Sequence, residues 1–195
     1  MQTEIIISGF GGQGVLFAGQ LLAFSALDLN LHVTWIPSYG PEMRGGTAHC
    51  TVIISDDEIG SPLVRDPRAA IVMNLPSLDR YESLVKPGGV LVVNASLVDR
   101  HPTRQDITTV MIPATEEAEA IGDRRMGNMI LLGALLELLP VLPPKAVGES
   151  LGRHIPAHHR DLLKSNLEAM ARGAALASAA RRDAVEPEAV SPGAA

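Results

Sequence analysis

A chain of 195 residues fits one domain of ordinary size and is long enough to bury a substantial core. Hydrophobic residues make up 46% of the sequence but aromatic residues only 3%, so the core must be built from aliphatic side chains and Met. The shortage of aromatic residues and the net charge of -6 both disfavour a nucleic-acid-binding protein, which uses aromatic platforms and a basic surface.

The single cysteine, Cys50, cannot form an internal disulfide and cannot by itself ligate an iron–sulfur cluster or a structural zinc ion. The sequence passes from Met1 directly into a strand-like run, without the regions typical of a signal peptide. The longest apolar run, residues 129–139, contains Glu137 and is too short to span a bilayer. These features predict a cytoplasmic protein that does not enter a membrane.

The chain opens with a short β-branched run, residues 4–8, which is typical of a buried strand. The segment GFGGQG follows, and the spacing of apolar residues over 15–30 predicts a helix. Gly9, Gly11 and Gly14 match the G-x-G-x-x-G pattern between a strand and a helix, as that motif requires. The N-terminus of the helix would offer free N–H groups to an anion.

A dinucleotide site also needs an acidic residue at the end of the second strand. That strand is predicted at residues 32–37, and it ends in WIPSYG without Asp or Glu, which disfavours NAD or FAD. Three interpretations of the glycine loop stay open: a crossover needed only for packing, a site for another phosphate-bearing ligand, and a contact with a partner protein. Gln13, at the apex of the loop, is expected to be exposed and favours a contact.

A polar loop, YGPEMRGG, separates the second strand from a third strand predicted at residues 48–55. The loop is expected at the carboxyl edge of the sheet, beside the glycine loop, where open α/β sheets bind their ligands. Arg44 can bind a carboxylate or phosphate through two parallel hydrogen bonds, and Glu42 can orient that arginine. The alternative is a surface ion pair in a long turn.

The remainder of the chain continues to alternate between strands and helices. Further strands are predicted at residues 69–74, 90–96 and 107–114. Further helices are predicted at 77–86, where Pro87-Gly88-Gly89 ends the helix, and at 115–122, 128–139, 143–155 and 158–182. Thr115 is the expected N-cap of its helix. The pattern predicts an α/β fold: a single doubly wound, mostly parallel sheet with helices on both faces, similar to a Rossmann fold. This domain covers residues 1–182, and residues 183–195 have the composition of a disordered tail.

The sequence also predicts whether several other residues are buried or exposed. The helix at 128–139 is apolar nearly all round, so it is expected in the centre of the packing, and part of it belongs either to the core or to a partner interface. Asn128 would cap this helix or bond across an interface. Cys50 is expected to be a small buried hydrophobic residue. The three histidines of RHIPAHHR are interpreted as surface residues rather than metal ligands: His154, His158 and His159.

The segments GFGGQGV and PSYGPEMRGGTAHCTVIIS, followed downstream by IPATEEAEAIGDRRMGNMILLGAL, are distinctive together. In this order they resemble the gamma subunit of the 2-oxoacid:ferredoxin oxidoreductases, over roughly residues 3–175. Within that family the sequence of the loop that contains Arg44, the arginine loop YGPEMRGG, is most similar to the 2-oxoglutarate branch.

The resemblance implies a subunit of an enzyme that converts a 2-oxoacid, coenzyme A and oxidised ferredoxin to an acyl-CoA, carbon dioxide and reduced ferredoxin. It implies thiamine-binding alpha and beta subunits and a ferredoxin-like delta subunit as partners, with ferredoxin as acceptor. Thiamine diphosphate, Mg²⁺ and the 4Fe–4S clusters would lie in those partners. This chain would hold no cofactor and no catalytic residue, and it would pack on the thiamine-binding subunits and help to bind coenzyme A.

By the same resemblance, the two loops supply the contact residues: Gly9, Gly11, Gly12, Gln13, Gly14, Tyr39, Glu42, Arg44, Gly45 and Gly46. Arg44 is expected to contact a phosphate of coenzyme A or a carboxylate of a neighbouring subunit. The alternative functions are the gamma subunit of a pyruvate, branched-chain, indolepyruvate or aryl 2-oxoacid oxidoreductase, and a stand-alone nucleotide- or CoA-binding regulatory protein.

Overall fold

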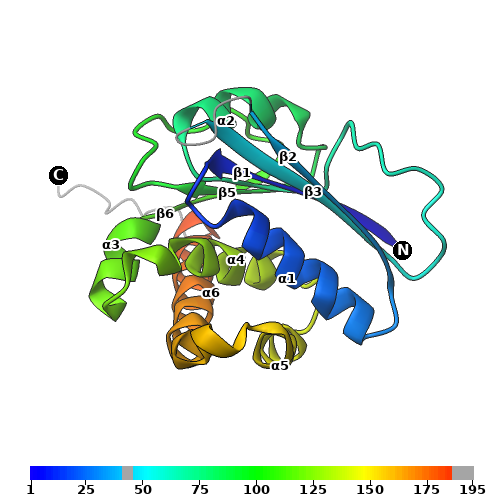
Figure 1. The fold of residues 1–195 in the computed structure, drawn as a ribbon. Helices are drawn as coiled ribbons and strands as arrows, with labels where there is room; N and C mark the ends of the chain where they lie inside the picture. The colour runs from blue at the N-terminus through cyan, green and yellow to red at the C-terminus, as the bar shows by residue number, and fades with distance from the viewer. Residues whose placement is uncertain (41–45, 186–195) are drawn as a thin grey trace, which may run out of the picture.

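Six strands form one sheet in the order β2-β3-β1-β4-β5-β6 in the computed structural model, which describes residues 1–40 and 46–185 (Figure 1). Strands β1, β4, β5 and β6 are parallel to one another, whereas β3 runs antiparallel to both β1 and β2. The strands are β1 (Gln2–Phe10), β2 (His32–Tyr39), β3 (Thr47–Ser55), β4 (Ala69–Val72), β5 (Val90–Asn94) and β6 (Thr108–Ile112). The predicted mostly parallel α/β sheet is therefore confirmed, with β3 as the exception.

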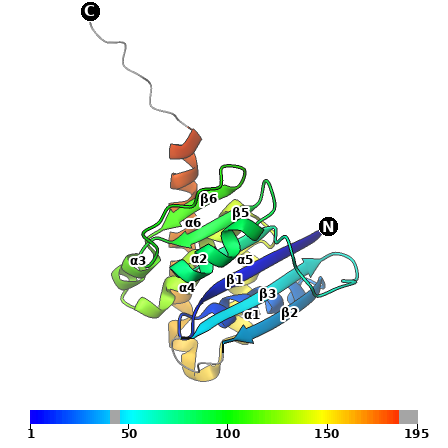
Figure 2. The same ribbon diagram turned by 90° about the horizontal axis from the view of Figure 1, so that it is seen from above.

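Helices cover both faces of the sheet, but unequally (Figure 1). Helix α2 (Leu75–Tyr81) lies on one face, and most of the other helices pack against the opposite face (Figures 1 and 2). These are α1 (Val15–Asp28), α3 (Ala114–Ile121), α4 (Gly127–Leu138), α5 (Pro144–His154) and α6 (Leu163–Val185), joined in places by the short 3-10 helices η2 (Arg124–Met126) and η3 (Ala157–Leu162). A third such helix, η1 (Glu82–Leu84), follows α2.

Two hydrophobic cores lie on the two faces of the sheet. Ile5 and Ile7 of β1 face the larger core with α1, α4 and α6, whereas Ile6 between them faces the smaller core under α2. Successive side chains of a strand point to opposite faces, so a strand covered on both sides is apolar at every position. This explains why the central strands are continuous apolar runs in the sequence.

Helix α4 lies in the centre of the larger core. All of its residues from Asn128 to Leu136 are buried. Helix α6 crosses it at two glycines: a Cβ atom at Gly173 would overlap the carbonyl oxygen of Ile130, and a Cβ at Gly133 would overlap that of Met170. The apolar surface of α4 is therefore covered by elements of this chain, so of the two interpretations the core is correct.

Several element boundaries differ from the prediction, and two of them are instructive. Helix α3 begins at Ala114, so Thr115 lies inside the helix and is not its N-cap. The Thr115 N–H instead donates to Oγ of Ser96, at 2.9 Å, so a hydroxyl from the segment after β5 satisfies a free N–H group of the first turn. The backbone of α6 continues to Val185, three residues beyond the expected domain boundary at 182. In the described part of the chain no helix is long and apolar enough to cross a membrane.

Candidate functional site

A cavity of about 330 Å³ lies at the carboxyl ends of β1, β4 and β5. Strand β1 continues into α1 on one face of the sheet, whereas β4 continues into α2 on the other face (Figure 1). Such a switch point between neighbouring strands opens a crevice and is the usual ligand site of an open α/β sheet. The walls of this carboxyl-edge cavity are Gly12, Gln13, Met73, Asn94, Leu97, Thr115, Arg124, Arg125, Gly127, Asn128 and Leu131.

Gln13 fixes the shape of the glycine loop. Its Oε1 accepts a hydrogen bond from the N–H of Phe10 at 2.6 Å, and its Nε2 donates to the carbonyl of Met73 at 3.4 Å. The side chain thus joins the end of β1 to the end of β4. The expectation of an exposed Gln13 is wrong: the side chain is half-buried because its amide serves backbone groups of the same chain.

Asn128 joins the start of α4 to the start of α1. Its Nδ2 donates to the carbonyl of Gly14 at 3.1 Å, and its Oδ1 accepts from the N–H of Met129 at 2.9 Å. Gly14 has a φ of 74°, and a Cβ there would collide with the Asn128 amide. Asn128 therefore bonds within the chain, to the glycine loop itself.

The electrostatics of the cavity favour an anion. Helix α1 begins at its wall with no acidic residue in its first turn and no side chain that caps its N-terminus. Helix α4 also begins there, but it continues η2, whose N-terminus the Asp123 carboxylate caps, and the N–H of Met129 donates to Asn128. The positive end of the α1 dipole and the free N–H groups of its first turn therefore border the cavity.

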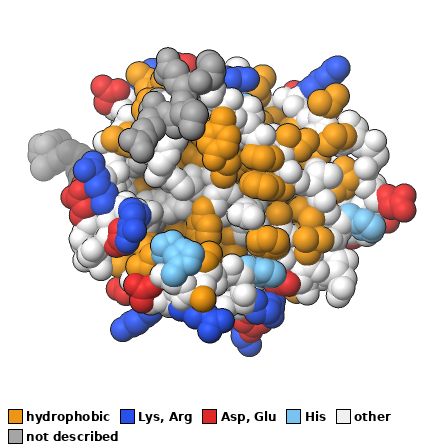
Figure 3. Space-filling model, in the orientation of Figure 1, with side chains coloured by type: hydrophobic (Ala, Val, Ile, Leu, Met, Phe, Trp, Pro, Cys, Tyr) orange, Lys and Arg blue, Asp and Glu red, His pale blue; other side chains and the backbone are white. Residues whose placement is uncertain are grey.

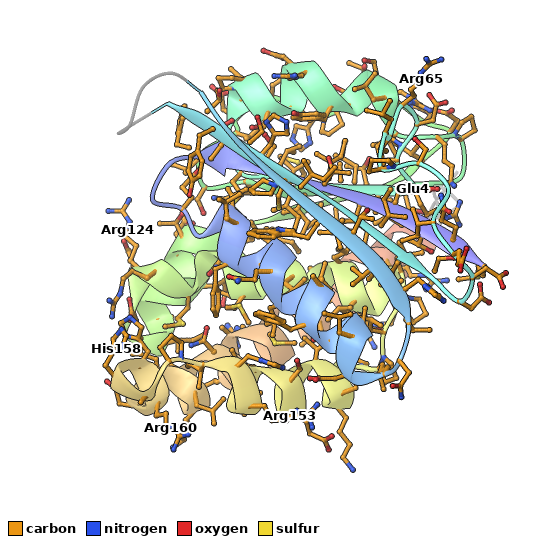
Figure 4. All side chains as sticks on the ribbon, turned by 45° about the vertical axis from the view of Figure 1, so that its right-hand side comes forward. Glu4, Arg65, Arg124, Arg153, His158 and Arg160 are labelled. Carbon is orange, nitrogen blue, oxygen red and sulfur yellow. The ribbon has the colours of Figure 1, made fainter. Side chains whose placement is uncertain are left out.

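Arg124 and Arg125 add two guanidinium groups at the rim. Their side chains are both 71% exposed; Arg124 pairs with Glu119 at 3.5 Å and Arg125 with Asp123 at 2.7 Å. The Arg125 guanidinium holds the pKa of Asp123 below its ordinary value. Figure 4 shows Arg124 projecting outward at this end of the molecule, and Arg65 lying at the other end. Exposed arginines can exchange a carboxylate partner for a phosphate of similar geometry.

Cys50 is buried, whereas the histidines of RHIPAHHR lie at or near the surface. Burial raises the pKa of the Cys50 thiol to about 12, so it stays protonated and packs as a small hydrophobic residue, as predicted. His158 and His159 are exposed, which confirms their interpretation as surface residues, and His154 stacks on Phe24. Among residues 1–40 and 46–182, no group of three or more His, Cys, Asp and Glu could hold a metal ion.

Gly46, the described end of the polar loop, contacts the glycine loop. The Gly11 N–H donates to the carbonyl of Gly46 at 2.9 Å, and Tyr39 is exposed at the end of β2. Gly46 therefore lies beside the glycine loop, as expected. Three of the predicted contact residues lie outside the described residues: Glu42, Arg44 and Gly45. The binding roles of both loops stay predictions.

The wall of the cavity opposite the glycine loop was not predicted from the sequence. Asn94, Thr115, Arg124 and Arg125 were not among the predicted site residues, yet they form its far wall. The only local signal was the pair of arginines directly before the apolar helix at Gly127. Nothing in the sequence shows that this helix begins opposite the glycine loop, because the contact spans more than half of the chain.

Comparison with known proteins gives consistent matches. The family model described as pyruvate ferredoxin/flavodoxin oxidoreductase matches residues 4–176. The ketoisovalerate oxidoreductase subunit VorA of Methanothermobacter marburgensis is 38% identical over 137 residues, which are 70% of this chain but only 28% of that protein. The 2-oxoglutarate synthase subunit KorC of Methanocaldococcus jannaschii is 35% identical over 177 residues, which are 89% of this chain and 92% of that protein.

Two solved structures share the fold. The gamma subunit of a keto/oxoacid ferredoxin oxidoreductase from Geobacter sulfurreducens is 30% identical, with a TM-score of 0.80, over 92% of this chain and 98% of that chain. The 2-oxoglutarate:ferredoxin oxidoreductase of Magnetococcus marinus, with 2-oxoglutarate, coenzyme A and succinyl-CoA bound, is 26% identical, with a TM-score of 0.81, over 91% of this chain and 31% of that chain. The chain belongs to the pyruvate ferredoxin/flavodoxin oxidoreductase family.

Proposed function

We propose that this chain is the gamma subunit of a cytoplasmic, thiamine-diphosphate-dependent 2-oxoacid:ferredoxin oxidoreductase, and that it binds coenzyme A at the carboxyl-edge cavity. The observation that carries the proposal is the cavity itself: the uncapped N-terminus of α1 and two exposed arginines converge on it in a chain whose net charge is -6. An anionic cosubstrate with a diphosphate group matches this chemistry.

We propose 2-oxoglutarate as the 2-oxoacid. Support comes from the identity to KorC and from the length of the match, which covers 92% of that 2-oxoglutarate synthase subunit. A branched-chain 2-oxoacid is the second candidate, since VorA, a ketoisovalerate oxidoreductase subunit, has the higher identity of 38% over a shorter segment. Residues that would choose between these acids belong to the partner subunits in this proposal.

The thiamine diphosphate, Mg²⁺ and 4Fe–4S clusters belong to partner alpha, beta and delta subunits in this proposal, with ferredoxin as acceptor. The chain's own residues do not fit a cluster, because its single cysteine is buried and protonated. Its contribution is to hold the phosphates of coenzyme A and to orient the cosubstrate toward the partner's active site. Gln13 and Asn128 act as positioning residues, since they fix the glycine loop against β4 and α4.

The test replaces the rim arginines in the assembled enzyme. For Arg124→Ala and Arg125→Ala we expect the KM for coenzyme A to rise about tenfold each, the effect of losing about 1.4 kcal/mol of a charge-assisted contact. The KM for the 2-oxoacid should change less than about twofold, because the arginines do not contact that substrate in this account. Arg44→Ala is expected to act in the same direction.

Arg65→Ala is the matched control, since Arg65 is an exposed arginine at the opposite end of the molecule (Figure 4). It should leave both constants unchanged. A double variant of Arg124 and Arg125 that assembles normally and keeps the native KM for coenzyme A would contradict the assignment of the cavity.

A further inference from the structure

The surface formed by α1 and the edge strand β2 carries almost no charge. No Lys, Arg, Asp or Glu occurs in residues 15–27 or 32–39, although such residues make up 19% of the chain. Figure 3 shows hydrophobic side chains gathered in the middle of the face that carries α1, with charged side chains mainly at its margins. An uncharged centre with a charged rim is the anatomy of a protein–protein interface. We call the surface of residues 15–27 and 32–39 the apolar face.

The few aromatic residues of the chain are concentrated on this face. The sequence contains one Trp, two Tyr and three Phe, and four of these six lie on α1 and β2: Phe17, Phe24, Trp35 and Tyr39. Phe17 is 37% exposed and Tyr39 69% exposed. A protein with so few aromatic residues would be expected to bury them in its core. Phe24 stacks on His154 and Trp35 packs against the larger core, so the partial exposure of Phe17 and Tyr39 is what favours burial by a partner, since aromatic side chains are enriched in interfaces.

The side chains of β2 extend the apolar face beyond α1. Trp35 and Tyr39 pair across the sheet with Val52 and Ala48, which belong to the larger core, so all four lie on the same side as α1. Leu27, near the end of α1, is 54% exposed. The face therefore has exposed apolar side chains near both ends of α1 and at the end of β2.

Strand β2 is an edge strand that is protected by a proline and not by charged side chains. Among the described residues it hydrogen-bonds only to β3, and none of its eight residues is Lys, Arg, Asp or Glu. Edge strands of free proteins are commonly protected by such charges. Pro37 lacks an N–H group, and proline in an edge strand turns that position outward. A further strand could not pair continuously past Pro37, so this edge is suited to side-chain packing rather than to pairing with β2 of a second copy.

The length of the relatives indicates what covers this face. The segment similar to this chain is 28% of VorA and 31% of the Magnetococcus marinus chain, so in those proteins the domain is part of one polypeptide with a much larger remainder. A separate chain with the same role needs a non-covalent surface for the corresponding larger subunit. The glycine loop directly precedes α1, and Phe17 lies three residues after Gly14, so this surface adjoins the carboxyl-edge cavity.

We propose that the apolar face is the docking surface for the larger, thiamine-binding subunit, and that it meets an uncharged apolar surface of that subunit. The inference rests on the proposed function and specifies its partner surface. Docking there places the larger subunit beside the mouth of the carboxyl-edge cavity. The subunit that completes the reaction would thus lie next to the cosubstrate site.

The test introduces single charges into the face. Gln20→Glu changes a half-buried amide of α1 to a carboxylate of the same size, and Leu27→Glu places a charge on an exposed position. Leu84→Glu is the matched control, because Leu84 is 39% exposed on η1, which follows the helix on the opposite face of the sheet. Binding of each purified variant to the thiamine-binding subunit from the same genome is measured by calorimetry, after thermal unfolding has shown that each variant is folded.

We expect Gln20→Glu and Leu27→Glu to weaken binding at least about tenfold, which is about 1.4 kcal/mol, and Leu84→Glu to bind like the native chain. A photo-crosslinking phenylalanine derivative at position 27 should form a crosslink to the thiamine-binding subunit, and the same group at position 84 should not. Native affinity of both α1 variants, or a crosslink from position 27 to a second copy of this chain, would overturn the inference. If the native chain itself binds no thiamine-binding subunit, the proposed function fails instead.

Discussion

Asp28 shows how a single carboxylate joins two helices around the core. It ends α1, and it accepts hydrogen bonds from Arg153 of α5 at 2.7 and 3.2 Å and lies 3.3 Å from Nε2 of His154. The ring of His154 stacks on Phe24, one turn earlier in α1, at 4.3 Å. The nearby Ser150 hydroxyl, which falls short of full hydrogen-bond geometry, and the Arg153 guanidinium lower the pKa of Asp28 from 3.8 to about 2.

This pKa predicts a dependence of stability on pH. A carboxyl whose folded-state pKa lies below its unfolded value stabilises the fold above about pH 4, and the contribution is lost as the pH falls toward about 2. We expect Asp28→Asn to lower the free energy of unfolding by about 1 kcal/mol at pH 7, a figure reduced for solvent screening. Urea unfolding at pH 7 and at pH 2.5 should show the difference shrinking at the lower pH. Glu58→Gln, at an exposed loop position, is the control. An Asp28→Asn variant with the native free energy of unfolding at pH 7 would contradict the account.

At the scale of residues, the sequence predicts the burial of an apolar side chain better than it predicts the hydrogen-bond partners of a polar group. Cys50 was correctly predicted to be buried, because a lone apolar thiol in a strand has no better place. Gln13 and Thr115 were misjudged. Gln13 bonds to Met73, 60 residues away, and the N–H of Thr115 bonds to Ser96, 19 residues away. A hydrogen bond between distant residues leaves no periodic trace in the sequence.

At the scale of elements, the crossing of α4 and α6 is the tightest contact between helices. Gly173 and Gly133 bring the two backbones together, since neither position has space for a Cβ atom. We expect Gly173→Ala to destabilise the protein by about 3 kcal/mol, because the added methyl group meets the rigid backbone of α4 at Ile130 rather than a side chain that can move. The measurement is the free energy of unfolding in urea.

Gly152→Ala is the matched control for this prediction. Gly152 also lies inside a helix, but its nearest neighbour to an added Cβ is Cδ2 of Leu163, at an ordinary 3.7 Å. We expect this variant to be as stable as the native chain or more stable by about 0.5 kcal/mol, because alanine is the better helix former. Equal effects of the two substitutions would show that the crossing is not held by its glycines.

Most elements could be predicted because each has a strong local pattern. The strands at 4–8, 69–74 and 90–96 are continuous apolar runs, and the helix at 128–139 is apolar all round, which matches their burial on every side. The antiparallel direction of β3 leaves no local pattern, because an apolar strand has the same pattern in either direction. The close approach of α6 to α4 depends on two glycines 40 residues apart, which no local pattern connects.

At the scale of the whole molecule, the sequence predicts the fold class and one half of the site. The G-x-G-x-x-G pattern marks the wall of the cavity that follows β1, because its glycines and the helix behind them are consecutive. The other wall comes from the ends of β4 and β5 and the start of α4, and only the order of the strands brings these together. The apolar face was not predicted, since partial exposure of Phe17 or Tyr39 is a property of the folded chain.

The central claim, that this chain is the gamma subunit of a 2-oxoacid:ferredoxin oxidoreductase, is tested most directly by reconstitution. The tagged chain is purified from its native cell under anaerobic conditions, and the complex is assayed for reduction of ferredoxin that depends on 2-oxoglutarate and coenzyme A. The account predicts co-purification with thiamine- and iron-containing subunits, loss of this activity when the chain is stripped from the complex, and recovery when it is added back. A chain that elutes alone, or a complex that remains fully active without it, would contradict the account.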